Sequence, residues 1–203
     1  MAKKPAPIEQ PNLLVVEGVD EQGVFGALLR HMGIANVQVI PTGGKTSLAD
    51  GLHGLKITTG FASVRSIGVV RDADADPNAA FGSVCGALRR EGLPVPPAPL
   101  VPDAGPPKVT VMILPTASHL GALEDLCLAA VAGDGAFPCV EKYFQCLHEA
   151  GVEGPRNQSR ARMQVFLASR PVAGKRLGEA AQYLPWDASA FDELRRFVQT
   201  VSS

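Results

Sequence analysis

Three aspartates stand at every second position directly after an apolar run, in the segment VVRDADADP at residues 69–77. In extended backbone, side chains two positions apart point the same way, so Asp72 and Asp74 are expected on one side with the small Ala73 between them. Two converging carboxylates repel each other unless a cation lies between them. Because carboxylate oxygens suit Mg²⁺ or Mn²⁺, which keep waters for a substrate phosphate, this spacing predicts a divalent metal site.

A second acidic residue ends an earlier apolar run. Glu17 and Gly18 follow the segment NLLVV, and the glycine lets the backbone turn tightly after the glutamate. In parallel α/β sheets, functional groups collect at the carboxyl ends of the strands. Glu17 is therefore expected beside Asp72 and Asp74, at the same edge of the sheet.

The elements that must position these residues alternate along the chain. Short valine-rich runs alternate with segments of helical periodicity, which predicts a parallel sheet with helices on both faces. The predicted strands are residues 12–18, 36–44, 64–72 and 108–115. The predicted helices are residues 20–32, 47–55, 77–90 and 120–133. Residues 93–107 contain seven prolines, which favour an extended edge segment or a surface loop.

The second part of the chain has only helical periodicity. We expect a flexible N-terminal tail at residues 1–11, an α/β core at residues 12–132, and a helical C-terminal part at residues 133–203 that packs on the core. A chain of 203 residues supports one sizeable core rather than two independent ones. The fold class predicted from the sequence is thus α/β, with a parallel sheet flanked by helices and a helical C-terminal extension.

Composition and charge exclude several classes of protein. With 46% hydrophobic and 19% charged residues and no apolar stretch of about 20 residues, the sequence predicts a globular protein without a membrane span. The N-terminal residues lack the apolar core of a signal peptide, so a cytoplasmic location is expected. A net charge of −1 excludes a uniformly basic nucleic-acid binder. Residues 154–178 nevertheless carry basic side chains and no acid, which suits either phosphate contacts or a solvated face.

The two acidic motifs together resemble the signatures of the Toprim domain. A strand that ends in VVEGVDEQ and a later strand that ends in VVRDADAD, each followed by a helix, match the family's order over residues 12–132. The length of the chain and its helical C-terminal part are most similar to small stand-alone bacterial Toprim-like proteins related to the OLD nucleases, whose function is largely unassigned. The resemblance implies a Toprim-like (Rossmann-like) fold and Mg²⁺-dependent phosphoryl transfer or strand cleavage.

The resemblance also implies roles for single residues. Glu17 would be the general acid or base, or a metal ligand, and Asp72 and Asp74 would be the metal-binding pair. Asp20 matches an acid that often follows the glutamate-glycine pair, although it could equally cap a helix. Asp76 would be an auxiliary or second-metal ligand, or else the cap of a helix that starts at Pro77.

Four further positions are candidate site residues. Glu124 resembles the extra acidic position of the OLD-type families, although the amphipathic pattern of its helix explains it almost as well. Lys45 follows two glycines, but Val39 stands where a Walker A phosphate loop needs glycine, so Lys45 is expected to touch a phosphate without forming such a loop. Arg160 and Arg162, in the basic stretch, are the other candidate phosphate-binding residues.

Three functions follow from these patterns. The first is a Mg²⁺- or Mn²⁺-dependent enzyme that cleaves phosphodiesters in nucleic acid, with the basic stretch holding the backbone. The second is a non-catalytic module that binds metal or phosphate within a larger complex, as a homodimer or with a partner protein. The third is a hydrolase of a small phosphate compound. The residues alone do not choose between nucleic acid and a small molecule.

Overall fold

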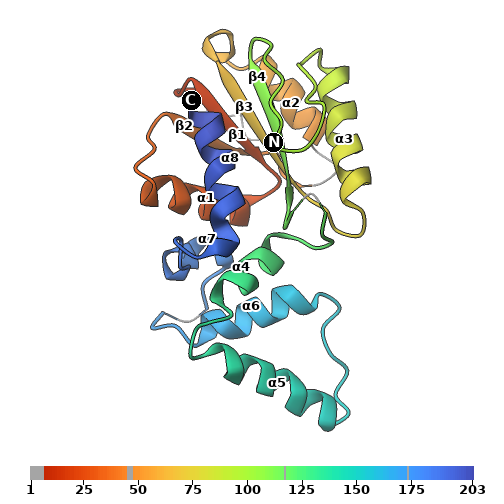
Figure 1. Ribbon diagram of the computed structural model, residues 1–203, viewed down its shortest axis with the longest axis vertical. Coiled ribbons are helices and arrows are strands. Elements are labelled where there is room, and N and C mark those ends of the chain that lie inside the picture. Colours follow the sequence, from red (N-terminus) through yellow and green to blue (C-terminus); the bar gives the residue numbers. More distant parts are fainter. Residues whose placement is uncertain (1–6, 45–47, 117, 173) are drawn as a thin grey trace, which may run out of the picture.

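The computed structural model describes residues 7–44, 48–116, 118–172 and 174–203 and contains one four-stranded sheet. All neighbouring strands are parallel, and their order is β2-β1-β3-β4. The strands are β1 (Asn12–Val16), β2 (Val37–Pro41), β3 (Ser66–Asp72) and β4 (Lys108–Leu114). This confirms the predicted α/β class, and the arrangement is Rossmann-like (Figure 1).

Helices cover both faces of the sheet, because side chains alternate between two apolar layers along each strand. Leu14 and Val16 point into the layer that contains α1 (Val19–His31) and α8 (Asp192–Ser202). The intervening residues of β1 and the matching residues of β3 and β4 point into the opposite layer, which packs against α2 (Leu48–Lys56) and α3 (Pro77–Arg90). The result is the three-layer core expected for a parallel sheet.

The C-terminal helix α8 is part of this core and lies directly on the sheet. A Cβ atom at Gly68 of β3 would lie 2.6 Å from Val201 Cγ2 and 2.9 Å from Phe197 Cζ, so the glycine gives α8 its close approach. The C-terminal end of α8 is held by Lys108, whose Nζ donates to the Thr200 carbonyl at 2.6 Å. Asn12 and Asn36 donate to the Ser202 carbonyl from the same end of the sheet.

The proline-rich segment lies along the outer edge of β4, which fits the first of its two predicted forms, an extended edge segment. Leu100 N donates to Val111 O at 2.8 Å, and Asp103 exchanges two backbone hydrogen bonds with Val109. Residues 93–107 therefore form an irregular, partly paired border and no full strand.

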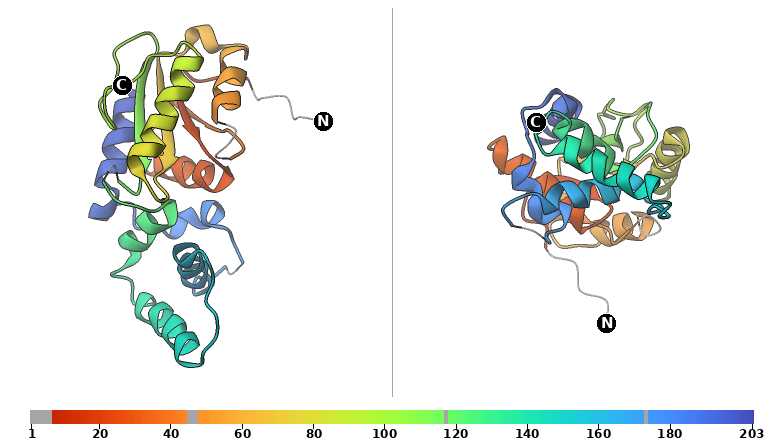
Figure 2. Two further views of the ribbon diagram at one scale, coloured as in Figure 1. Left: turned by 90° about the vertical axis from the view of Figure 1, so that its right-hand side faces the viewer. Right: turned by 90° about the horizontal axis from the view of Figure 1, so that it is seen from below.

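The remaining helices lie beyond the carboxyl ends of the strands (Figures 1 and 2). They are α4 (Leu123–Val131), α5 (Phe137–Glu149), α6 (Gln158–Ala168) and α7 (Leu177–Ala180). Elsewhere in the described chain, short 3₁₀ turns lie at Phe61–Ser63, before β3, and at Ala181–Tyr183 and Ser189–Phe191. We call α5, α6 and their connection (residues 137–168) the distal arm. The helices of residues 133–203 therefore divide into three groups: α8 completes the core, α7 packs against α1, and the distal arm projects away from the sheet.

No helix in the described part of the chain has both the length and the apolar character needed to cross a membrane.

Candidate functional site

A cleft of about 450 Å³ lies at the carboxyl ends of β1 and β3. Its walls include the first turns of α1, α4 and α6, so three helices begin at its border. Six acidic residues line it: Glu17, Asp20, Glu21, Asp72, Asp74 and Glu124. The structure therefore brings together the predicted residues Glu17, Asp72, Asp74, Asp20 and Glu124, which come from separate segments of the chain.

Glu17 is held by both its backbone and its side chain. Its carbonyl oxygen accepts hydrogen bonds from Gly43 N at 3.0 Å and Gly44 N at 2.9 Å, and both glycines have positive φ angles. The side chain is largely buried: Oε1 lies 3.2 Å from Arg71 Nε and accepts a hydrogen bond from Asp72 N at 3.3 Å. The ion pair with Arg71 offsets the cost of burying the Glu17 carboxylate.

Asp72 lies at the end of β3 and is only 9% exposed. Its Oδ1 accepts a hydrogen bond from Leu123 N at 3.1 Å, at the first residue of α4. Burial is the largest cause that raises the pKa of Asp72, which reaches about 8 with the negative charges around it. Those charges belong to Glu17, Glu21, Glu124 and Asp74. Asp72 is thus a carboxylate that the fold disfavours in its ionised form.

Asp74 lines the same cleft but has a different backbone conformation from the one expected. Its φ angle is 51°, in the left-handed region that aspartate tolerates better than most residues. Asp74 N donates to Gly121 O at 2.8 Å, and Gly121 N donates to Asp74 O at 2.9 Å. The extended backbone predicted from Asp72 to Asp74 is therefore wrong: β3 ends at Asp72, and pairing with Gly121 turns the chain so that Asp74 still borders the cleft.

Glu21 is a member of the cluster that the sequence prediction missed. It stands in the first turn of α1, where burial and then the charges of Glu17 and Glu124 raise the pKa of its carboxyl group. A Cβ atom at Gly18 would lie 2.9 Å from Glu21 Oε2, so the glycine after Glu17 also leaves room for this side chain. The sequence signal that could have identified Glu21 is its position as an acidic residue in the first helical turn after a strand end.

Two of the predicted ligands have structural roles. Asp76 Oδ1 accepts hydrogen bonds from Asn78 N at 2.9 Å and Ala79 N at 3.0 Å, so it caps α3 and does not line the cleft. Of the two roles considered for Asp76, metal ligand or helix cap, the structure shows the helix cap. Asp20 does line the cleft, but its Oδ1 accepts from Gly178 N at 3.3 Å and does not cap α1.

The predicted phosphate-binding residues divide in the same way. Arg160 lines the cleft together with Asn157 and Arg176. Arg162 does not: its Nε lies 3.1 Å from Glu141 Oε1, and its guanidinium stacks over the ring of Phe144 at 4.7 Å from the centroid. Lys45 lies outside the described residues.

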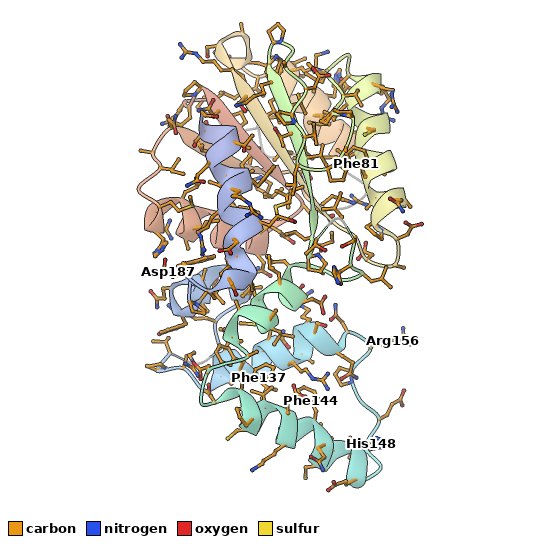
Figure 3. All side chains as sticks on the ribbon, in the orientation of Figure 1. Phe81, Phe137, Phe144, His148, Arg156 and Asp187 are labelled. Carbon is orange, nitrogen blue, oxygen red and sulfur yellow. The ribbon has the colours of Figure 1, made fainter. Side chains whose placement is uncertain are left out.

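A second hollow of about 470 Å³ lies in the distal arm, between α5 and α6. It is lined by Phe144, His148 and Arg162, and Figure 3 shows Phe144 and His148 on α5 at the end of the molecule far from the sheet. None of the predicted acidic residues lines it, so the cleft at the strand ends is the candidate site.

The donor set of the cleft suits a hydrated ion more than a preformed cage. Among the described residues, no three His, Cys, Asp or Glu side chains are arranged to hold a metal ion together. Mg²⁺ commonly binds through only one or two carboxylates and completes its shell with waters and substrate phosphates. Asp72 and Asp74 satisfy that lower requirement, and a cation beside them would relieve the repulsion that raises the pKa of Asp72.

Comparisons with known proteins place the chain in a family without placing it in a pathway. No curated protein matches it. The crystal structure of hypothetical protein PH0156 from Pyrococcus horikoshii OT3 is similar over 95% of each chain, with a TM-score of 0.59 and 17% sequence identity, which shows the fold alone. The family described as "Protein of unknown function (DUF3226)" matches residues 11–203. This chain therefore belongs to the DUF3226 family.

Proposed function

We propose that this protein is a Mg²⁺- or Mn²⁺-dependent phosphoryl-transfer enzyme of the Toprim type that cleaves phosphodiesters in nucleic acid. One observation carries the proposal: Glu17, Asp72, Asp74 and Glu124, from three separate segments of the chain, line one cleft at the strand ends. Structural carboxylates are normally paired or solvated, whereas burial, and after it the negative charges of the neighbouring carboxylates, raises the pKa of Asp72 to about 8. Such an arrangement is typical of a site that binds a cation or moves a proton.

Asp72 and Asp74 would hold the metal ion. A bound divalent ion supplies Lewis acidity toward a phosphoryl oxygen and lowers the pKa of a coordinated water. Leu123 N, at the start of α4, donates to Asp72 Oδ1 and so fixes the direction of the carboxylate. Glu124, the next residue on α4, lines the same cleft and is the candidate for a further, water-mediated contact.

Glu17 would act as the general base or acid. The Arg71 guanidinium at 3.2 Å stabilises the negative form of Glu17, which is the form that can accept a proton. The backbone hydrogen bonds from Gly43 and Gly44 keep the end of β1 in place, so the position of the carboxylate is set by the fold.

The test is a nuclease assay with single- and double-stranded oligonucleotides and added Mg²⁺ or Mn²⁺. We expect metal-dependent cleavage by the wild type and a loss of about 100-fold or more in Glu17→Gln and Asp72→Asn. Glu9→Gln is the matched control, because Glu9 is an exposed carboxylate before the start of β1, at the opposite end of the sheet. Cleavage that persists unchanged in both cleft variants would refute the proposal.

The second candidate is a binding module without turnover, and the Arg71–Glu17 ion pair favours it. In the described chain Glu17 already faces a cation, and no three candidate ligands form a preformed metal site. A module of this kind would bind metal or phosphate and show no cleavage of oligonucleotides or of a small phosphate ester such as p-nitrophenyl phosphate. Cleavage of the small ester alone would instead favour the hydrolase of small phosphate compounds.

A further inference from the structure

The cleft has two walls of opposite charge. The carboxylates come from β1, β3 and the first turns of α1 and α4, whereas Arg160 comes from α6 and Arg176 from the residue before α7. Both arginines line the cleft that also contains six acidic residues.

Arg160 and Arg176 differ from the other arginines around them. Arg162 is paired with Glu141, and Arg170 forms a two-pronged ion pair with Asp134 at 3.0 and 3.1 Å. In contrast, the Arg160 guanidinium has no ion pair or hydrogen bond with any residue that the structure describes.

Arg176 makes only a weak local contact. Its partner is Glu179, one helical turn away at 3.6 Å, and both side chains are more than half exposed. A surface pair of this kind contributes little stability and is easily exchanged for another partner. Arg176 and Arg160 therefore face the acidic wall of the cleft without pairing to it. The cleft therefore suits an anionic ligand between its two walls. Such a ligand would contact the arginines on one side and a metal ion on the other.

The two arginines are also fixed relative to the acidic wall. Ser159 Oγ donates to Asp125 Oδ1, and Asp125 Oδ2 accepts from Ala122 N at 2.8 Å, so the first turn of α6 is tied to the first turn of α4. This joint holds Arg160 at a set distance from Glu124.

A second joint fixes Arg176. A Cβ atom at Gly23 of α1 would lie 2.5 Å from Gly178 Cα, so the two segments touch backbone to backbone. Gly178 N also donates to Asp20 Oδ1. Arg176, two residues earlier, is thereby anchored to the helix that carries Glu21.

We propose that Arg160 and Arg176 form a phosphate subsite that binds a phosphate mono- or diester without metal, opposite the metal-binding wall. This inference rests on the proposed function, in that the ligand is a phosphate ester, and it adds the residues that would position that ester. Guanidinium groups suit this task because they donate several hydrogen bonds in one plane to phosphate oxygens. The ester could belong to a nucleic-acid backbone or to a small phosphate compound.

Binding measurements in EDTA test the subsite separately from cleavage. The probes are a fluorescently labelled single-stranded oligonucleotide, with affinity followed by anisotropy, and inorganic phosphate and adenosine monophosphate, followed by calorimetry. We expect Arg160→Gln and Arg176→Gln each to weaken binding about tenfold, which is the loss expected for a hydrogen bond to a charged group. Arg162→Gln is the control and should stay within about twofold, because Arg162 is paired outside the cleft.

The outcomes separate the sources and can overturn the proposal. Tight binding of the oligonucleotide, with a salt slope that falls by about 1 for each arginine removed, assigns the subsite to nucleic acid. Binding of adenosine monophosphate with no gain from the longer strand assigns it to a small ester. The proposal is overturned if no probe binds in EDTA, or if Arg162→Gln weakens binding as much as the two cleft variants. If the wild type binds the probes as expected but cleaves no oligonucleotide, the result counts against the proposed function and not against the phosphate subsite.

Discussion

The two ends of the same sheet use polar residues in opposite ways. At the amino end, Asn12, Asn36 and Lys108 all donate to carbonyl groups at the end of α8, so each polar group satisfies another. At the carboxyl end, burial and then the surrounding carboxylates raise the pKa of Asp72. Polar residues at the amino end stabilise the fold, whereas those at the carboxyl end cost stability. A cluster that costs stability is the stronger evidence for function.

Among substitutions that test this difference between the two ends of the sheet, we expect Asp72→Asn to have the largest effect on activity. The amide oxygen can still accept from Leu123 N, but the charge is lost, so metal-dependent cleavage should fall about 100-fold or more. In EDTA at pH 8 the same variant should be more stable than the wild type. Thermal unfolding and the nuclease assay on one preparation measure both effects. A variant that loses activity and stability together would contradict the contrast, because Asp72 would then be a structural residue.

The pH dependence of stability should show the same site in the wild type. The ordinary pKa of Asp72 is 3.8 and the folded value is about 8, so the folded chain holds a proton that the unfolded chain releases. The free energy of unfolding contributed by this group is therefore unchanged below about pH 4 and falls as pH rises toward 8. The total loss is on the order of a few kcal/mol at most.

Denaturant unfolding between pH 4 and pH 8, in EDTA, measures that loss, and Asp72→Asn is expected to flatten the curve. Because metal binding needs the ionised carboxylate, Mg²⁺ affinity should rise with pH over the same interval and binding should release a proton. Calorimetry in two buffers of different ionisation enthalpy detects that proton. An Mg²⁺ affinity independent of pH would show that Asp72 is not a ligand.

At the amino end, Lys108→Met should lower stability and leave chemistry intact. Nζ of Lys108 donates to the Thr200 carbonyl and to a main-chain oxygen and Oγ of Ser203, so the variant leaves the end of α8 without its cation. We expect a loss of about 1–2 kcal/mol in the free energy of unfolding. Lys142→Met, at an exposed position of α5, is the control. An equal loss of unfolding free energy in the two variants would show that the hydrogen bonds of Lys108 to the end of α8 do not stabilise the fold.

The smallest expected effect is in Ser159→Ala, which changes no charge. It removes the hydrogen bond to Asp125 that ties α6 to α4, so Arg160 should be less well positioned. Oligonucleotide affinity in EDTA should fall by roughly fivefold, the equivalent of one hydrogen bond. Ser169→Ala, at the other end of α6, keeps this joint and should bind like the wild type.

The sequence predicted the sheet well because its signals are local. Valine-rich runs marked the strands, and helical periodicity marked α1 and α3, whose bounds lie within one residue of the predicted ones. Glu17 and Asp72 were found because a carboxylate at the end of an apolar strand is a local pattern as well. The positions of these residues at one edge then followed from parallel pairing.

Other features depend on contacts between distant segments, which no local pattern encodes. The pairing of Asp74 with Gly121 sets its left-handed backbone, and the Arg71–Glu17 ion pair joins the ends of two strands. Helical periodicity predicted a helix at α8, but its position on the sheet follows from its packing against the strands at Gly68, which the pattern of the helix itself does not contain. Arg160 and Arg162 look alike in the sequence, and their separation follows from the orientation of α6.

The central claim is that the carboxylate cleft binds a divalent metal ion. A crystal structure of the protein grown with Mn²⁺, in which anomalous scattering locates the ion, tests it most directly. We predict one Mn²⁺ within about 2.0–2.3 Å of a carboxylate oxygen of Asp72 or Asp74, with waters completing its shell. An empty cleft at saturating Mn²⁺, with Glu17 still paired to Arg71, would contradict the account.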